Sequence, residues 1–185
     1  MGALVIPGGY YLLRLDKTDV LIIMIPITIL MILIDVSRLR QWIFWREFAG
    51  KIISPVIRHH EMSGDFTGAT YILLSVCLTV ALYDKPTAIA ALTFVIVGDS
   101  LAAVIGRSLG RHKFGNKTVE GSLGCLVGTA IVAVLVPGLA LVVGLFGAVT
   151  ATIVEALPWQ IDDNITVPIL SGLSMTLFSK VLLNL

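Results

Sequence analysis

Residues 86–105 read PTAIAALTFVIVGDSLAAVI, an apolar run that contains a single charged residue, Asp99. A helix needs about 20 apolar residues to cross about 30 Å of hydrocarbon, so this stretch predicts a membrane-spanning helix. The whole chain is similar, because 57% of its 185 residues are hydrophobic and 14% are charged. Soluble domains carry about 25% charged residues. We therefore expect an integral membrane protein, with no room for a soluble nucleotide-binding domain.

The other apolar runs predict further spans. The runs are continuously apolar rather than alternating, which favours helices over a barrel. We expect one domain over residues 1–185, an all-α polytopic membrane bundle of about six to seven transmembrane helices. The first run is short, and we expect a helix whose N-terminal part lies elsewhere. The candidate spans are Gly2 to Leu13, Val20 to Val36, Thr67 to Tyr83, Pro86 to Ile105, Ser122 to Val136, Leu139 to Leu157 and Thr166 to Leu183.

Basic residues indicate the orientation. Nine of the thirteen Lys and Arg residues lie between Ser37 and Phe66 or between Gly106 and Gly121. Both segments are expected on one side of the membrane, and the positive-inside tendency makes that side cytoplasmic. The chain should return to the same side at Pro158 to Asn164. The lack of sorting signals favours a prokaryotic cell membrane.

Residues Arg38 to Val56 place Trp and Ile side chains at roughly helical spacing, with charged residues on the other side. This pattern predicts an interfacial amphipathic helix. It is either a plain membrane anchor or a gate for a lipid substrate, and the sequence leaves both alternatives open.

Asp99 is the first candidate for chemistry. An ionisable residue within a membrane span indicates a functional site. Gly106 and Gly110 lie seven and eleven residues further on, which returns them to the same helical face. A small-residue packing stripe would explain the glycines, but not the carboxylate.

The segment from Gly106 to Ser122 is predicted to be a loop that binds phosphate. Phosphate is bound by the planar guanidinium groups of arginine and by the ammonium groups of lysine, and glycine lets the backbone come close to it. The segment resembles a P-loop in spacing, but Asn116 precedes Lys117 and an apolar helix replaces the required strand. A basic anchoring loop is the alternative. The candidate phosphate-binding residues are Ser100, Gly106, Arg107, Gly110, Arg111, Lys113, Lys117, Thr118, Glu120 and Gly121.

Two further acidic groups are candidates. Glu155 is followed by Asp162, Asp163 and Asn164 at the entrance to the last span. Such oxygen ligands suit Mg²⁺, although one of these residues could simply cap the helix. Glu61, beside His59 and His60, is the acid that we expect to matter most in the first polar segment.

These runs together resemble the family that contains dolichol kinase, phytol kinase and CTP-dependent diacylglycerol kinase, which is distantly similar to phosphatidate cytidylyltransferase. The runs are Gly98-Asp99-Ser100 to Arg111, Lys117-Thr118-x-Glu120-Gly121-Ser122, and Glu155 to Pro168. The resemblance covers roughly residues 61–185. It implies a multipass enzyme that uses CTP and Mg²⁺ to phosphorylate a lipid alcohol. It would also place Asp99 in the metal and nucleotide site, residues 117–121 in its loop, and Asp162 or Asp163 on the opposite wall.

We therefore expect phosphoryl transfer from CTP to a prenol or diacylglycerol at the cytoplasmic face. Asp99, Glu61 and Glu155 are the expected catalytic residues, and Asp99, Asp162, Asp163 and Asn164 the expected ligands of Mg²⁺. A cytidylyltransferase and a small ion-coupled transporter are the alternatives. The expected partners are the lipid and the nucleoside triphosphate, not nucleic acid, and assembly into a homo-oligomer stays open.

Overall fold

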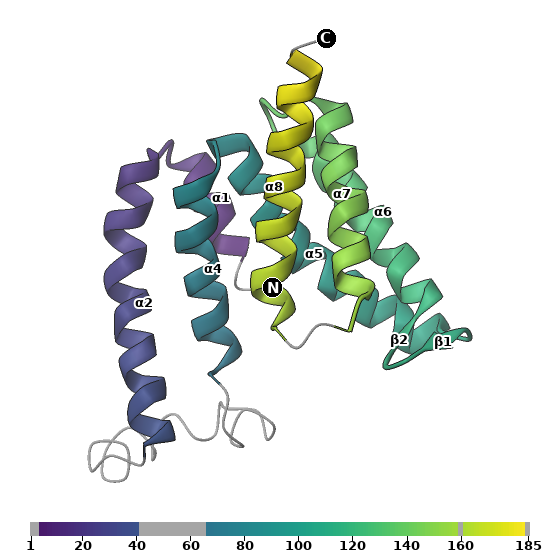
Figure 1. The fold of residues 1–185 in the computed structure, drawn as a ribbon, viewed down its shortest axis with the longest axis horizontal. Helices are drawn as coiled ribbons and strands as arrows, with labels where there is room; N and C mark the ends of the chain where they lie inside the picture. The colour runs from purple at the N-terminus through teal and green to yellow at the C-terminus, as the bar shows by residue number, and fades with distance from the viewer. Residues whose placement is uncertain (1–3, 41–65, 159–160, 184–185) are drawn as a thin grey trace.

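The computed structural model describes residues 4–40, 66–158 and 161–183. Its helices confirm the predicted all-α class, with one short β hairpin added. The elements in the described ranges are α1 (Val5–Leu12), α2 (Lys17–Leu39), α4 (Gly68–Leu82), α5 (Lys85–Leu109), β1 (Lys113–Phe114), β2 (Lys117–Thr118), α6 (Val119–Leu135), α7 (Leu141–Ala156) and α8 (Asp163–Leu183) (Figure 1).

Three of these helices, α2, α5 and α8, are long and apolar enough to cross a membrane. Helices α4, α6 and α7 are apolar but shorter, at 15 to 17 residues. The first predicted span does form a helix, α1, but its eight residues rise only about 12 Å. Helix α1 is therefore too short to be a transmembrane span.

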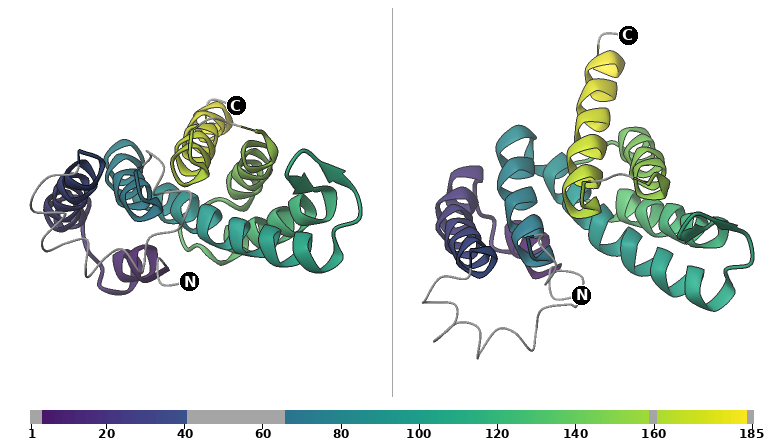
Figure 2. Two further views of the ribbon diagram at one scale, coloured as in Figure 1. Left: turned by 90° about the horizontal axis from the view of Figure 1, so that it is seen from below. Right: turned by 60° about the horizontal axis from the view of Figure 1, so that its bottom comes forward.

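Helix α5 lies at the centre of the bundle. It contacts α4, α6, α7 and α8, and α1 packs beside it. Helix α8 lies between α4 and α7, while α2 packs on α4 at one edge and α6 on α7 at the other (Figures 1 and 2). Phe94 of α5 and Met175 of α8 are fully buried in the core. Asp99 thus belongs to the helix that organises the fold.

Small residues allow α5 and α6 to pack closely. A Cβ on Gly128 would lie 2.4 Å from Leu101 Cδ1, and one on Gly121 would lie 2.9 Å from the carbonyl oxygen of Ala102. A Cβ on Gly106 would lie 2.9 Å from Thr118 Oγ1. The packing alternative therefore does explain the glycines, including two of the predicted phosphate-binding residues.

The segment predicted as a loop from Gly106 to Ser122 is largely ordered as helix and hairpin. Helix α5 continues to Leu109, because no residue there breaks it and Arg107 Nε and Ser108 Oγ donate to carbonyl groups one turn back. The hairpin then turns at Gly115, whose φ is +57°, a conformation that glycine adopts without strain. Thr118 caps α6 by accepting a hydrogen bond from the Gly121 amide.

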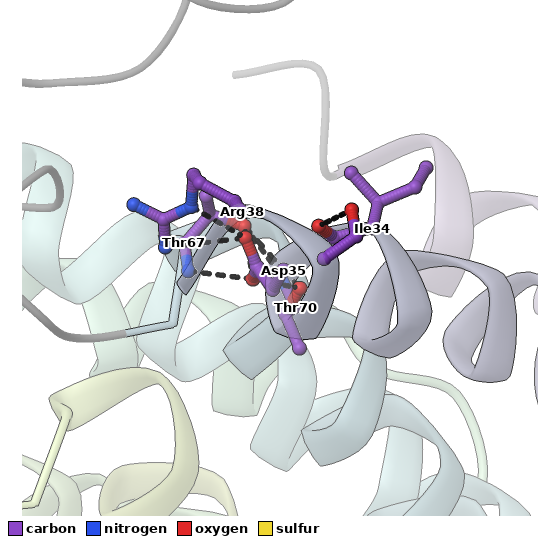
Figure 3. A network of polar contacts seen from close by, with 6 residues as sticks. Ile34, Asp35, Arg38, Thr67 and Thr70 are labelled. Atoms are coloured by element: carbon purple, nitrogen blue, oxygen red, sulfur yellow. Dashed lines mark hydrogen bonds and ion pairs between the residues drawn. The ribbon is translucent and has the colours of Figure 1, made fainter. Parts of the chain in front are cut away.

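A buried polar network joins α2 to α4 (Figure 3). The carboxylate of Asp35 accepts hydrogen bonds from Arg38 Nε at 3.2 Å, from the Thr67 amide at 2.8 Å and from Thr70 Oγ1 at 2.7 Å. Arg38, predicted as the start of an interfacial helix, instead lies in the last turn of α2. The rest of that predicted helix falls in residues 41–65, outside the described residues.

Candidate functional site

A cavity of about 500 Å³ opens where α5 ends, α6 begins and α7 ends. Its charged lining combines acids and bases from segments that are far apart in the sequence. This volume lies within the range of about 300–1,000 Å³ that is typical of small-molecule sites. The lining residues are Asp99, Ala102, Ala103, Gly106, Arg107, Gly110, Lys113, Asn116, Lys117, Thr118, Gly121, Ser122 and Glu155.

Lys117 connects the hairpin to the α7–α8 connection. Its Nζ lies 3.0 Å from Glu155 Oε1 and 3.0 Å from Asp163 Oδ2. It also donates a hydrogen bond to the backbone carbonyl of Glu155. The side chain of Lys117 is 29% exposed and that of Glu155 only 9%. Of the three polar segments expected to converge, the second and third therefore meet at Lys117, and the first lies mostly outside the described residues.

The same contacts set the charge of Lys117. Burial acts to lower the pKa of its ammonium group, but hydrogen bonds to Asp163 and Glu155 outweigh burial and raise the pKa above its ordinary value. Lys117 is therefore a permanent cation near neutral pH, which suits charge neutralisation and not general-base catalysis.

Two polar atoms in the cavity wall have no protein partner. Among the described residues, Glu155 Oε2 and Ser122 Oγ are buried and make no hydrogen bond. A buried group without a partner is costly, so these atoms point to a ligand in the cavity. The free oxygen of Glu155 can accept a hydrogen bond from a ligand hydroxyl, and Asp99 in the same lining suits Mg²⁺, which commonly takes one or two carboxylates together with substrate phosphates. No cluster of three or more metal-binding side chains occurs within the described ranges.

Most of the predicted phosphate-binding residues do line the cavity, but three do not. Ser100 Oγ donates instead to the Ile96 carbonyl. Arg111 is exposed on the hairpin side. Glu120 pairs with His112, with Nδ1 and Oε1 2.7 Å apart.

The Glu120–His112 pair holds the hairpin against the start of α6. The hydrogen bond from His112 lowers the pKa of Glu120 to about 2, so the carboxylate is ionised at any physiological pH. Glu120 therefore stabilises the hairpin through His112 and does not line the cavity.

The predicted metal ligands near the start of α8 have different partners. Asp163 pairs with Lys117, whereas Asp162 Oδ1 accepts hydrogen bonds from the amide nitrogen of Asn164 at 2.8 Å and from its Nδ2 at 2.6 Å. Asp162 thus precedes α8 as a capping residue, whereas the sequence had offered Asp163 or Asn164 for that role. Glu61, with His59 and His60, lies outside the described residues.

Two cavity residues escaped the sequence analysis. Asn116 was noted there only because it breaks the P-loop pattern, and Ser122, although part of the resembling run, was not among the candidate site residues. The signal for Asn116 was its position immediately before Lys117, because adjacent residues of a hairpin turn can line the same site.

The chain matches no protein-family model and no solved structure. It is 27% identical over 191 residues to the uncharacterized protein RP860 of Rickettsia prowazekii, covering 98% of this chain and 92% of that protein. It is 24% identical over 161 residues to CTP-dependent diacylglycerol kinase 1 of Schizosaccharomyces pombe, covering 75% of this chain and 71% of the kinase. A distant similarity to a lipid kinase thus accompanies the membrane helices and the charged cavity.

Proposed function

We propose that this protein is a membrane lipid kinase that transfers the γ-phosphate of CTP to a lipid alcohol. The observation that carries the proposal is the cavity itself, where Asp99 and Glu155 share a wall with the cations Arg107, Lys113 and Lys117. Phosphoryl transfer needs a metal-binding acid, cations for the phosphates and a positioned hydroxyl. The similarity to CTP-dependent diacylglycerol kinase 1 supports the choice of reaction and of donor.

In this proposal each side chain has one task. Arg107, Lys113 and Lys117 neutralise the phosphates in the cavity. Asp99 would hold Mg²⁺, which neutralises the charge that develops on the phosphate oxygens. Glu155 Oε2 would accept the hydrogen bond of the lipid hydroxyl and orient it towards the γ-phosphorus.

The position of the cavity suits two substrates that arrive from different phases. The helices that line it are apolar, whereas the hairpin beside it is exposed and basic. We propose that the nucleotide enters from the cytoplasm and that a prenol or diacylglycerol enters laterally from the bilayer. Asp162 and Asn164 then serve the α8 cap, and the predicted role of Glu61 remains part of the proposal.

Position-specific labelling tests the reaction. Purified protein in micelles is given a lipid alcohol (diacylglycerol or a polyprenol) or, in a parallel reaction, the lipid phosphate phosphatidate, with Mg²⁺ and CTP labelled at either the γ- or the α-phosphate. A kinase transfers the γ label to the lipid. Transfer of the α label to a lipid phosphate would show a cytidylyltransferase instead, and uptake by proteoliposomes without CTP turnover would show a transporter.

Asp99→Asn tests the centre of the site. We expect at least a 100-fold loss of turnover, because losing one electrostatic contact to the transition state costs about 10²–10³. Asp19→Asn is the matched control, since Asp19 lies at the opposite end of the chain's transmembrane region and its capping bond to the Asp16 amide needs only an acceptor oxygen. Chelation of Mg²⁺ should abolish turnover and its return should restore it. Near-normal turnover of Asp99→Asn would remove Asp99 from the mechanism.

A further inference from the structure

A second cavity, of about 450 Å³, adjoins the first and shares Asn116 and Lys117 with it. Its other walls come from the hairpin residue Phe114 and from Leu157 and Pro158, just after α7. The proposed reaction assigns no part of either substrate to this second cavity. The two cavities are adjacent, and both lie against Asn116 and Lys117.

The two cavities differ in chemistry. The first has Asp99, Arg107 and Lys113 in its wall, as suits phosphate and metal. The second contains an aromatic ring, a proline, a leucine and the amide of Asn116. Phe114 is 39% exposed, so its ring is accessible to a ligand.

We propose that the second cavity binds the base of the nucleotide, with the ring of Phe114 stacked on it. This inference rests on the proposed function, which places the phosphates of the same nucleotide in the first cavity. A base has flat π faces that stack on aromatic side chains. Its edge carries hydrogen-bond donors and acceptors, and the Asn116 amide offers both.

The walls favour a base over a lipid chain. Lys117 and Asp163 also line this cavity, and an acyl chain placed there would have to desolvate both charges. A base attached through a ribose to phosphates at Lys117 leaves those charges their polar partners. The ring of Phe114 then acts as a specificity element for nucleotides over simple polyphosphates.

The test compares CTP with inorganic tripolyphosphate, which has the phosphates but no base. Both are titrated against the full chain in detergent micelles, for wild type and for Phe114→Leu. This substitution removes the ring and keeps an apolar side chain. We expect the Kd for CTP to rise about tenfold, in line with the loss of one stacked base, and the Kd for tripolyphosphate to stay unchanged. Phe114→Trp keeps an aromatic ring at this position, so its Kd for CTP should stay close to that of the wild type.

Three results would overturn the inference. Equal weakening of both ligands would mean that Phe114 only supports the hairpin. An unchanged Kd for CTP would mean that the base lies elsewhere. A rise in the KM for lipid, with CTP binding unchanged, would assign the cavity to the lipid. The labelling assay on wild type separates the two proposals: γ-phosphate transfer with an unaffected Phe114→Leu variant refutes the base site alone, and a lack of transfer refutes the kinase.

Discussion

Lys117 is the residue on which the site is assembled. It contacts residues 38 and 46 positions away in the sequence, Glu155 and Asp163. Its removal would take from the buried Glu155 both its ion pair and the hydrogen bond to its backbone carbonyl. The lysine therefore has a structural task in addition to the catalytic one that we propose, and the two tasks can be measured separately.

We predict that Lys117→Met lowers the free energy of unfolding by about 2 kcal/mol, because hydrogen bonds to charged groups contribute about that much. The same variant should lose nucleotide binding. The double variant Lys117→Met, Glu155→Gln should regain part of the stability, because the buried acid is no longer charged, but none of the activity. Thermal unfolding in detergent and CTP turnover are the two measurements.

The pH dependence of the free energy of unfolding follows from the raised pKa of Lys117. A lysine whose folded-state pKa is raised contributes stability that is fully present below its ordinary value of 10.5 and is lost as the pH rises through the folded-state value. The difference in stability between wild type and Lys117→Met should therefore be constant from neutral pH to pH 10.5 and shrink above it. A difference that vanished below pH 9 would contradict the ion pairs.

At the scale of elements, the Asp35 network fixes α2 on α4. Asp35 is 1% exposed within a helix that can span a membrane, and it has three kinds of partner: an arginine, a backbone amide and threonine hydroxyls. The contacts of α2 in the described part of the chain are mostly with α4. The position of α2 in the bundle therefore depends on its contact with α4 and on this network within it.

Asp35→Ala should destabilise the protein by about 3 kcal/mol, since it removes the buried acceptor of the Thr67 amide and of the Thr67 and Thr70 hydroxyls, together with the ion pair to Arg38. Asp35→Asn should cost less, because its amide oxygen still accepts from Thr67 and Thr70. Asp19→Asn, on the exposed first turn of the same helix, should change stability by less than about 0.5 kcal/mol. A loss for Asp35→Ala as small as that of this control would refute the role of the network.

The elements also show what could be predicted from the sequence. The six longer helices follow from apolar runs, and their observed ends lie within a few residues of the predicted ones. The continuation of α5 to Leu109 could not be seen, because glycine and basic residues there are equally typical of loops. The network at Asp35 was missed because its threonine partners lie 32 and 35 residues away in the sequence.

The residues of the candidate site likewise include some that the sequence predicted and others that only the folded chain brings together. The position of Asp99 at the cavity could be predicted, because an ionisable residue within a membrane span indicates a site, whereas its catalytic role stays a prediction. The partners of Lys117 could not, since only the packing of α7 and α8 brings them to the hairpin. Asp162 was assigned to metal because a capping acid and a ligating acid look alike in a sequence.

At the scale of the whole molecule, the bundle has two unlike ends. Helices α2, α5 and α7 end, and α4, α6 and α8 begin, on the side of the hairpin (Figure 1). Six basic residues of the described ranges lie on this side: Arg38, Arg40, Arg107, Arg111, Lys113 and Lys117. Four lie at the opposite helix ends: Arg14, Lys17, Lys85 and Lys180. The hairpin side, with the cavity, should therefore face the cytoplasm.

This orientation predicts opposite labelling of two cysteine variants. Arg111→Cys lies beside the hairpin and Lys17→Cys at the first turn of α2, and both positions are exposed. A membrane-impermeant maleimide added to intact cells should label only Lys17→Cys, and added to inverted vesicles only Arg111→Cys. The unmodified chain is the control, because Cys77 and Cys125 lie within apolar helices. Labelling of Arg111→Cys in intact cells would place the cavity on the outer face, away from cytoplasmic CTP, and would contradict the proposed reaction together with the orientation.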